Sequence, residues 1–295
     1  MRDEVDLAIV GAGPAGLSAA IEAVRSGVSH RIFSEEEPGG LIRAAGVVEN
    51  CALLNGVKGI EIAKTLCENA VRKGIQLIYS RVIDIKKTGS LFFLKLESGE
   101  SYFSKAVILA TGTTPRHANF PIYHKNKNGT EDRIFYDTRA MNEDLRNMRV
   151  IISGGGEIAF DSALSVSLRG AVTTVVMRSS KPRTNSGLSE RVASASISIH
   201  PESVITSARV LTDSVVICVK DSTGKDCEFE ADYLLVCHGR EPKLELYENL
   251  VGDEKEVKGV FLAGDVINKD MRYLTLAMGQ GTQAAIEAEK YIKEV

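Results

Sequence analysis

Short apolar runs that lead into glycine-rich turns recur along this chain. Residues 7–10 (Leu-Ala-Ile-Val) form one such run, and a glycine turn at 11–16 and a small-residue segment to about Arg25 follow it. An unbroken apolar run is typical of a strand buried on both faces of a parallel sheet, and the segment after the turn favours a helix packed on that sheet. With a further strand near 31–33, this pattern predicts a β-α-β unit.

The same order returns in the second half of the chain. The apolar run 150–153 leads into the turn 154–159, a helix to about Leu168 and a strand at 172–176. We therefore predict an α/β protein with two dinucleotide-binding, Rossmann-like domains. Further antiparallel or returning strands are predicted at 91–96, 102–109, 215–219, 228–230 and 233–236, and a long final helix at 273–293.

Two irregular stretches predict how the domains are connected. Residues 115–149 and 242–250 carry prolines and many charges, which is typical of crossings between domains. Two crossings mean that one domain is inserted into the other. We expect residues 1–116 and 245–295 to form a discontinuous outer domain around an inserted domain at 117–244.

Composition and charge exclude several classes of protein. The chain has 295 residues, of which 44% are hydrophobic and 25% charged, so it is predicted to be folded and large enough for two domains. No apolar run is long enough to span a membrane and the N-terminus is acidic, so we expect a cytoplasmic protein without membrane contact. A formal net charge of -3 argues against a nucleic-acid partner and favours small molecules or proteins.

The cysteines indicate reduced thiols. Their number is odd and their spacing is wide, and no C-x-x-C pair exists. This absence argues against zinc ribbons, iron–sulfur ligation of the usual spacing and a thioredoxin-like active site, so no metal site is predicted. The five are Cys51, Cys67, Cys218, Cys227 and Cys237.

The first glycine turn has the features of a dinucleotide-binding motif. Gly11 permits a tight turn, Gly13 lets the backbone approach a pyrophosphate, and Gly16 allows close helix packing. The helix that follows offers free N–H groups and partial positive charge to phosphate. An acid that binds the ribose is expected about 20 residues on, where Glu35, Glu36 and Glu37 are all candidates.

The second turn is followed by a basic segment. Gly154 and Gly156 are kept and Ala159 takes the third position, while residues 177–183 contain three cations and no acid. Cations suit the 2′-phosphate of NADP, whereas an acid suits the ribose of NAD, so we favour NADP over NAD. A solvated basic loop is the alternative interpretation.

Five features occurring in order along the chain resemble the low-molecular-weight thioredoxin reductase group of two-dinucleotide-fold flavoproteins. They are the segments 11–16, 38–40, 110–112, 154–159 and 259–265, the last with Arg272 and a small-residue helix after it. The resemblance implies FAD in the outer domain, a pyridine nucleotide in the inserted one, and a homodimer. It also implies that Asp265 hydrogen-bonds the FAD ribityl chain, that the final helix points its N-terminus at the flavin, and that residues 48–50 contact the flavin.

The residues expected to bind the two cofactors are carried over from these motifs. For FAD they are Gly11, Gly13, Pro14, Ala15, Gly16, Glu35, Gly39, Gly40, Leu41, Asn50, Ala110, Thr111, Gly112, Gly264, Asp265 and Arg272. For the pyridine nucleotide they are Gly154, Gly155, Gly156, Glu157, Ile158, Ala159, Arg178 and Arg183.

Three departures from the family pattern bear on function. The region that carries a C-x-x-C in thioredoxin reductases, here 133–141, has no cysteine. The family's His-Arg-Arg run for the 2′-phosphate becomes Met-Arg-Ser at 177–179, and the usual acid after the second strand aligns near Ser34.

No catalytic side chain is firmly indicated by the sequence. Cys51 follows the expected flavin-contacting segment as a candidate redox thiol, although free cysteine is more often a small buried hydrophobe. His238 is a candidate proton donor near the flavin, although a hydrogen-bonded histidine at a strand end is more common.

Together these features predict an FAD-dependent NAD(P)H oxidoreductase that passes hydride between NADPH and FAD. Because the dithiol is missing, the expected acceptor is a small electron-transfer protein of the ferredoxin or flavodoxin type or a small-molecule oxidant, as in the similar thioredoxin-reductase-like ferredoxin:NADP reductases. Two alternatives are open: a disulfide reductase acting through Cys51, and a flavin- or nucleotide-binding regulator without turnover.

Overall fold

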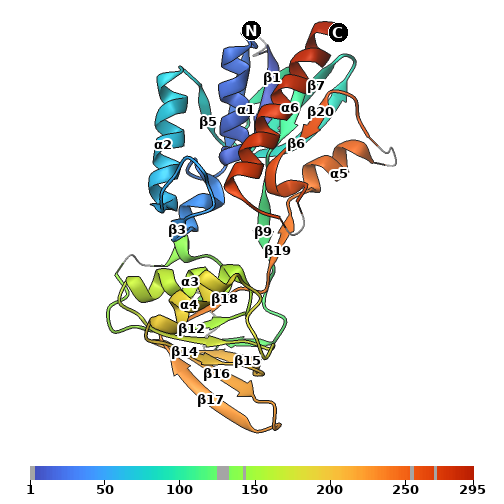
Figure 1. The fold of residues 1–295 in the computed structure, drawn as a ribbon. Coiled ribbons are helices and arrows are strands. Elements are labelled where there is room, and N and C mark those ends of the chain that lie inside the picture. The colour runs from blue at the N-terminus through green and yellow to red at the C-terminus, as the bar shows by residue number, and fades with distance from the viewer. Residues whose placement is uncertain (1–3, 125–132, 142–143, 253–255, 269–270) are drawn as a thin grey trace. The chain divides into compact units, whose positions relative to one another are not determined.

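The computed structural model describes residues 4–124, 133–141, 144–252, 256–268 and 271–295. The chain folds into two compact units (Figure 1). The first comprises Met1–Arg43, Val47–Thr114 and Glu241–Val295, and the second comprises Ala44–Gly46 and Pro115–Arg240. The chain crosses between them in β9 (Thr113–Pro115) and β19 (Arg240–Pro242), which pair with each other.

The first unit is a mixed sheet with helices. Its strands are ordered β5-β2-β1-β8-β7-β6, and β20 also pairs with β8. Strands β1, β2, β5, β8 and β20 are parallel, whereas β6 and β7 are antiparallel additions. The elements are β1 (Glu4–Val10), α1 (Pro14–Arg25), β2 (His30–Ser34), η1 (Gly40–Ala44), β3 (Val47–Val48), β4 (Val57–Lys58), α2 (Gly59–Arg72), β5 (Leu77–Tyr79), β6 (Val82–Thr88), β7 (Leu91–Leu96), β8 (Ser101–Leu109), α5 (Glu245–Val251), β20 (Val260–Leu262), η3 (Gly264–Val266) and α6 (Leu274–Glu294).

Helices α1 and α6 lie side by side in this unit (Figure 1). Small residues on both helices permit this close approach. A Cβ built at Gly281 of α6 would lie 2.0 Å from the backbone oxygen of Ala15 in α1, closer than any real contact. Glycine at 281 is therefore required by helix packing.

We expect Gly281→Ala to lower the free energy of unfolding by about 2–3 kcal/mol, because the added methyl forces the two helices apart. Gly279→Ala is the matched control, since a Cβ there meets nothing within 4 Å. It should leave stability unchanged or raise it by about 0.5–1 kcal/mol through helix propensity. Urea denaturation of both variants checks this, and equal stabilities would contradict it.

The second unit has two sheets. A five-stranded sheet of order β11-β18-β12-β13-β14 is parallel throughout, and a second sheet has the order β10-β15-β16-β17. The elements are β10 (Ile122–His124), β11 (Ile134–Phe135), η2 (Thr138–Ala140), β12 (Arg149–Ser153), α3 (Glu157–Leu168), β13 (Val172–Val176), α4 (Ser186–Ser194), β14 (Ile197–His200), β15 (Val204–Val210), β16 (Val215–Lys220), β17 (Asp226–Ala231) and β18 (Tyr233–Val236).

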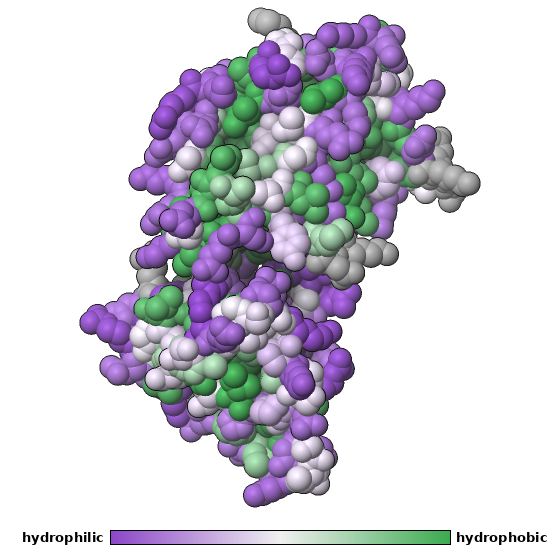
Figure 2. All heavy atoms as spheres, in the orientation of Figure 1, coloured by the Kyte–Doolittle hydropathy of each residue, from purple (hydrophilic) through white to green (hydrophobic). Residues whose placement is uncertain are grey.

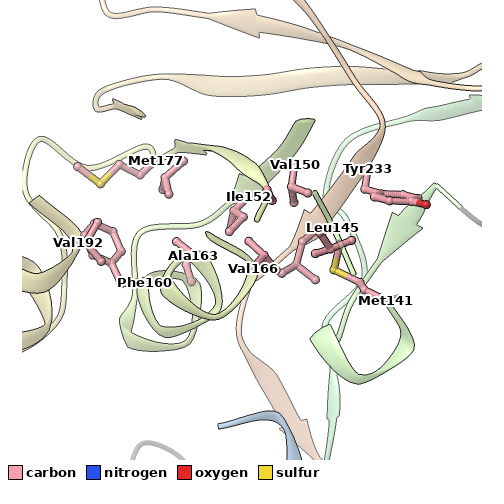
Figure 3. Close-up of a cluster of buried hydrophobic side chains, with 14 of the residues drawn as sticks. Met141, Leu145, Val150, Ile152, Phe160, Ala163, Val166, Met177, Val192 and Tyr233 are labelled. Carbon is pink, nitrogen blue, oxygen red and sulfur yellow. The ribbon is translucent and has the colours of Figure 1, made fainter. Parts of the chain in front are cut away.

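The parallel sheet of the second unit is buried on both faces, as its apolar strands predict. On one face, Val150 and Ile152 of β12 pack with Phe160, Ala163 and Val166 of α3 (Figure 3). On the other face, residues of β12, β13 and β18 pack against the second sheet through β15 and β16. This double burial fixes the position of the glycine turn that follows β12.

The predicted order of strands, turns and helices agrees with the structure. α1 ends at Arg25, α3 ends at Leu168 and β13 spans Val172–Val176. The predicted irregular stretches are partly wrong. The described part of 115–149 contains β10, β11 and η2, and 242–250 contains most of α5, which packs on β6. The ranges of the two units change at 114/115 and 240/241, close to the expected bounds of 116/117 and 244/245.

Polar residues predominate on the visible face of each unit, with apolar residues in smaller patches (Figure 2). Among the described residues, no helix is long and apolar enough to cross a bilayer.

Candidate functional site

The first glycine turn is built by contacts that leave one position open. Gly11 has a φ of 107°, and a Cβ there would lie 2.2 Å from the backbone oxygen of Ala110, so this position requires glycine. At Gly16 a Cβ would lie 1.8 Å from the oxygen of Gly11. Gly13 differs, because its φ of -76° suits any residue and the nearest atom to its Cβ position, the Cα of Gly40, is 4.0 Å away.

Segments distant in sequence surround this turn. The N–H of Gly39 donates to the Ala12 oxygen at 2.8 Å, and a Cβ at Gly40 would lie 3.0 Å from the Cα of Gly13. The structure therefore brings the second predicted motif onto the first, with Leu41 following in η1. Residues 110–112 follow β8, the strand beside β1, so they lie at the same sheet edge as the turn.

The last predicted motif lies beside these segments. The N–H of Ala263 donates to the Leu109 oxygen, and a Cβ at Gly264 would lie 2.8 Å from the Cβ of Ala15. Gln280 and Asn268 fix the backbone here: Gln280 Oε1 accepts from the Gly264 N–H at 3.1 Å and from Asn268 Nδ2 at 2.9 Å. This amide pair holds η3, and so Asp265, in place.

The helices α1, α2, α5 and α6 of the first unit have no side-chain cap, and two of them, α1 and α6, begin beside the predicted motifs. α1 begins after Gly13 with Pro14 in its first turn, and α6 begins after Tyr273, next to Arg272. Their first N–H groups are thus available to a ligand or to water.

For two of the predicted FAD-binding residues, Glu35 and Asn50, the described residues show no contact with the glycine motifs or Asp265. Glu35 is exposed and lies 3.8 Å from Arg81 in an ion pair. Asn50 is exposed in the loop between β3 and β4. The structure therefore groups the glycine motifs and Asp265 without these two residues, and the cofactor-binding role of all of them stays a prediction.

The second glycine turn repeats the first. Gly154 has a φ of 151°, and a Cβ there would lie 2.5 Å from the backbone oxygen of Cys237 and 3.2 Å from Ala159 Cβ. Gly156, the N-cap of α3, has a φ of -98° and nothing within 4 Å of its Cβ position. Glu157 and the exposed Ile158 open the helix, which no side chain caps.

The basic segment predicted to select NADP lies against this turn. The N–H of Arg183 donates to the Gly155 oxygen at 2.7 Å, and a Cβ at Gly155 would lie 3.2 Å from Ser179 Oγ. Arg178 is exposed, follows β13, and its charge acts on His238. The structure thus brings the backbone of Arg183 to the glycine turn and places Arg178 at the end of β13, the strand beside β12.

His238 and Cys237 follow β18, next to β12. His238 Nε2 lies 2.8 Å from Ser153 Oγ, and burial, followed by the charge of Arg178, lowers the pKa of the imidazole. Burial raises the pKa of the Cys237 thiol to about 12, and a hydrogen bond to Ser162 offsets this only in part. The Cys237 thiol is thus protonated at neutral pH and unsuited to thiolate chemistry.

The segment 133–141, which contains no cysteine, is an ionic turn. Asp137 caps η2 by accepting from the Arg139 N–H at 2.9 Å, and its carboxylate pairs with the Arg139 guanidinium at 2.8 Å. Arg240 Nη1 lies 4.0 Å from the same carboxylate, and Arg169 donates to the Met141 oxygen at 2.9 Å. These contacts hold the segment within the second unit by ion pairs and hydrogen bonds, with no cysteine.

Comparison with known proteins identifies the family. Residues 5–281 match the family model described as "Pyridine nucleotide-disulphide oxidoreductase". The chain belongs to this family. Among curated proteins, the "34.2 kDa protein in rubredoxin operon" of Clostridium pasteurianum is 30% identical to this chain, and 99% of each chain is covered. A thioredoxin reductase of Treponema pallidum is 29% identical over 99% of this chain and 98% of its own.

Solved structures of this family agree with the fold. The thioredoxin reductase of Lactococcus lactis superposes with a TM-score of 0.88 at 26% identity, covering 99% of this chain and 100% of its own. The predicted resemblance to thioredoxin reductases and the predicted fold of two Rossmann-like domains are therefore confirmed. The prediction of an oxidoreductase of the FAD-dependent pyridine nucleotide class is also confirmed.

Several residues at these sites were not predicted from sequence. Asn268 and Gln280, Ser153 beside His238, and Ser179 beside Gly155 gave no signal, because their roles depend on partners far along the chain.

Proposed function

We propose that the first unit binds FAD, the second binds NADP(H), and the protein catalyses hydride transfer between the nicotinamide C4 and the flavin N5. One observation carries this proposal. Each unit has a glycine, Gly13 or Gly156, that neither backbone geometry nor protein neighbours require, at the N-terminus of an uncapped helix. An open glycine at that position suits a pyrophosphate.

The chain's own residues supply binding and orientation. The α1 N-terminus would hold the FAD pyrophosphate and Asp265 the ribityl chain, while the uncapped α6 N-terminus would stabilise negative charge on the flavin pyrimidine. In the second unit, Arg178 and Arg183 would hold the 2′-phosphate. When bound, FAD supplies the redox chemistry, because its ring accepts a hydride and releases electrons onward.

We infer that the acceptor is a small electron-transfer protein of the ferredoxin or flavodoxin type, or a small oxidant. The ionic turn around Asp137 supports this inference, because a disulfide relay needs two sulfurs close together. A relative is described as a protein in a rubredoxin operon, which is consistent with a partner of this kind.

The direct test is anaerobic stopped-flow reduction followed by an acceptor screen. The purified protein should release about one FAD per chain, and NADPH should bleach the flavin rapidly. Release of FMN, or no flavin after reconstitution with FAD, would contradict the cofactor assignment. A flavin that neither NADPH nor NADH bleaches would favour a regulator without turnover.

A disulfide reductase acting through Cys51 is the second candidate. It is favoured by the thioredoxin reductase relatives and by the place of Cys51 after the predicted flavin-contacting segment 48–50. Against it, Cys51 is buried, with 8% of its surface exposed, in a turn where its oxygen accepts from the Leu54 N–H.

We expect Cys51→Ser to retain most NADPH-dependent reduction of ferricyanide, because electrons leave the flavin directly. Wild-type protein should show no thioredoxin-dependent reduction of an aromatic disulfide. Cys67→Ser, at a half-buried thiol in α2, is the matched control. Thioredoxin-linked activity that vanishes only in Cys51→Ser would establish the disulfide reductase instead.

We also propose the homodimer and the cytoplasmic location that the sequence suggests. Light scattering of the purified protein tests the first, and cell fractionation tests the second.

A further inference from the structure

The hydrogen-bonded pair of His238 and Ser153 has no part in the function proposed above. It lies where the strand order of the second unit reverses. The parallel strands β12, β13, β14 and β18 follow one another along the chain, but they are ordered β14-β13-β12-β18 in space. Dinucleotides bind in the crevice beyond the carboxyl ends of the strands at such a reversal. Ser153 ends β12 and His238 follows β18, so the pair spans this edge.

The first unit shows which position His238 occupies. In the first unit, the backbone oxygen of Ala110 lies 2.2 Å from the position that a Cβ at Gly11 would take. In the second unit, the backbone oxygen of Cys237 lies 2.5 Å from the position that a Cβ at Gly154 would take. Ala110 and Cys237 are therefore equivalent, and His238 corresponds to Thr111. Thr111 donates its hydroxyl to the backbone oxygen of Lys243 at 2.8 Å, so its side chain is engaged within the protein.

His238 instead keeps one ring nitrogen available. Nε2 is engaged by Ser153 Oγ at 2.8 Å, and Nδ1 has no hydrogen-bond partner among the described residues. Because burial and the charge of Arg178 lower its pKa, the imidazole is neutral at pH 7. If the serine hydroxyl donates to Nε2, the proton resides on Nδ1, which is then a donor.

We propose that His238 binds the pyridine dinucleotide, with its Nδ1–H donating to an oxygen of the nicotinamide-side phosphate. Ser153 is the positioning residue that sets the tautomer and the ring plane. The arrangement complements Arg178 and Arg183, which lie on the β13 side of the glycine turn, the side of the adenosine ribose. The inference rests on the proposed binding of NADP(H) to the second unit.

A purely structural role would be carried by contacts that do not need Nδ1. The ring packs edge-on against Phe120 at 5.8 Å between centroids, and Nε2 bonds Ser153. Glutamine at 238 keeps an amide nitrogen near the position of Nε2, whereas asparagine keeps one near Nδ1. The two substitutions therefore separate the structural role from the binding role.

Two ligands locate the contact on the dinucleotide. NADP⁺ carries the nicotinamide-side phosphate, and adenosine 2′,5′-bisphosphate lacks it. Calorimetric titration of the flavin-loaded oxidised protein should show that His238→Gln weakens NADP⁺ binding roughly tenfold or more and leaves the bisphosphate unchanged. His238→Asn should retain most NADP⁺ affinity, and Ser153→Ala should weaken NADP⁺ binding less than His238→Gln does. His124→Ala, at an exposed histidine of β10, is the control and should change neither affinity.

Unchanged NADP⁺ affinity in His238→Gln would overturn the inference, as would equal loss of both ligands or equal loss in the Asn and Gln variants. Thermal denaturation of each variant shows whether it is folded. Wild-type protein that binds no NADP⁺ would instead refute the proposed function, and the two failures are thereby distinguishable.

Discussion

A Gly13→Val variant should fold normally and bind FAD at least about a hundredfold more weakly than the wild type, because the side chain occupies the place of the pyrophosphate. That loss corresponds to two or more charge-assisted hydrogen bonds of about 1.5–3 kcal/mol each. The backbone at 13, with φ -76° and ψ -176°, accepts valine, and beyond the chain neighbours the nearest atom of the described residues to the Cβ position is the Cα of Gly40, at 4.0 Å. Flavin absorbance of the reconstituted protein and its thermal denaturation measure the two properties.

Gly156→Val is the matched control in the second unit. Its N-cap position is equally open, with φ -98° and nothing within 4 Å of the Cβ position. It should leave FAD binding intact and abolish rapid reduction of the flavin by NADPH. Gly16→Val offers a contrast, because a Cβ there would lie 1.8 Å from the Gly11 oxygen and should prevent folding of the turn itself.

The assignment of FAD to the first unit and of NADP(H) to the second depends on the different effects expected of Gly13→Val and Gly156→Val. If Gly13→Val remained yellow, or if Gly156→Val lost flavin and Gly13→Val did not, FAD would not bind at the first glycine turn. If neither variant folded, these two glycines would be required for folding, and the open space around their Cβ positions would not explain their presence.

Arg178→Ala should raise the KM for NADPH roughly 10- to 100-fold and leave the KM for NADH nearly unchanged. A charge-assisted hydrogen bond to a phosphate contributes about 1.5–3 kcal/mol, and only NADPH carries the 2′-phosphate. Arg178 is exposed at the end of β13, beside the turn that Arg183 holds through its backbone N–H. Steady-state kinetics with ferricyanide as acceptor measure both constants.

Arg209→Ala is the control for this prediction. Arg209 lies on β15 and pairs with Glu228 at 2.8 Å, so its loss removes one cation from the second unit without altering the glycine turn. Equal increases of KM for NADPH and NADH in Arg178→Ala would show that the loop positions the adenosine as a whole. No change for either nucleotide would mean that the basic segment is only a solvated loop.

Strand and helix positions could be predicted where the pattern is local. The runs 7–10 and 150–153 are strands because buried parallel strands are continuously apolar, and the turns after them carry the glycines that backbone geometry requires. Helix α2 was missed, although Ile62, Leu66 and Ala70 recur on its buried face at helical spacing. Helix α4 was missed too, although Asn185 caps it by accepting from the Leu188 N–H.

Crossings between the units were less predictable, because charge and proline content do not distinguish a linker from short edge strands. Residues 122–124 and 134–135 pair with β15 and β18, whose positions are far along the chain. Backbone hydrogen bonding to distant partners therefore decides their conformation.

The sequence by itself determined the class of the protein and most of its cofactor motifs, because each motif is a run of neighbouring residues with one backbone requirement. Only the tertiary structure decided which motifs meet: Gly39 on Ala12, Gly264 on Ala15, Arg183 on Gly155. It also decided that Asp137 forms an ionic turn with Arg139, and that His238 lies against Ser153 at the edge of the second unit. These contacts join residues up to 249 positions apart (15 to 264), and no local pattern records the packing of strands and helices that brings them together.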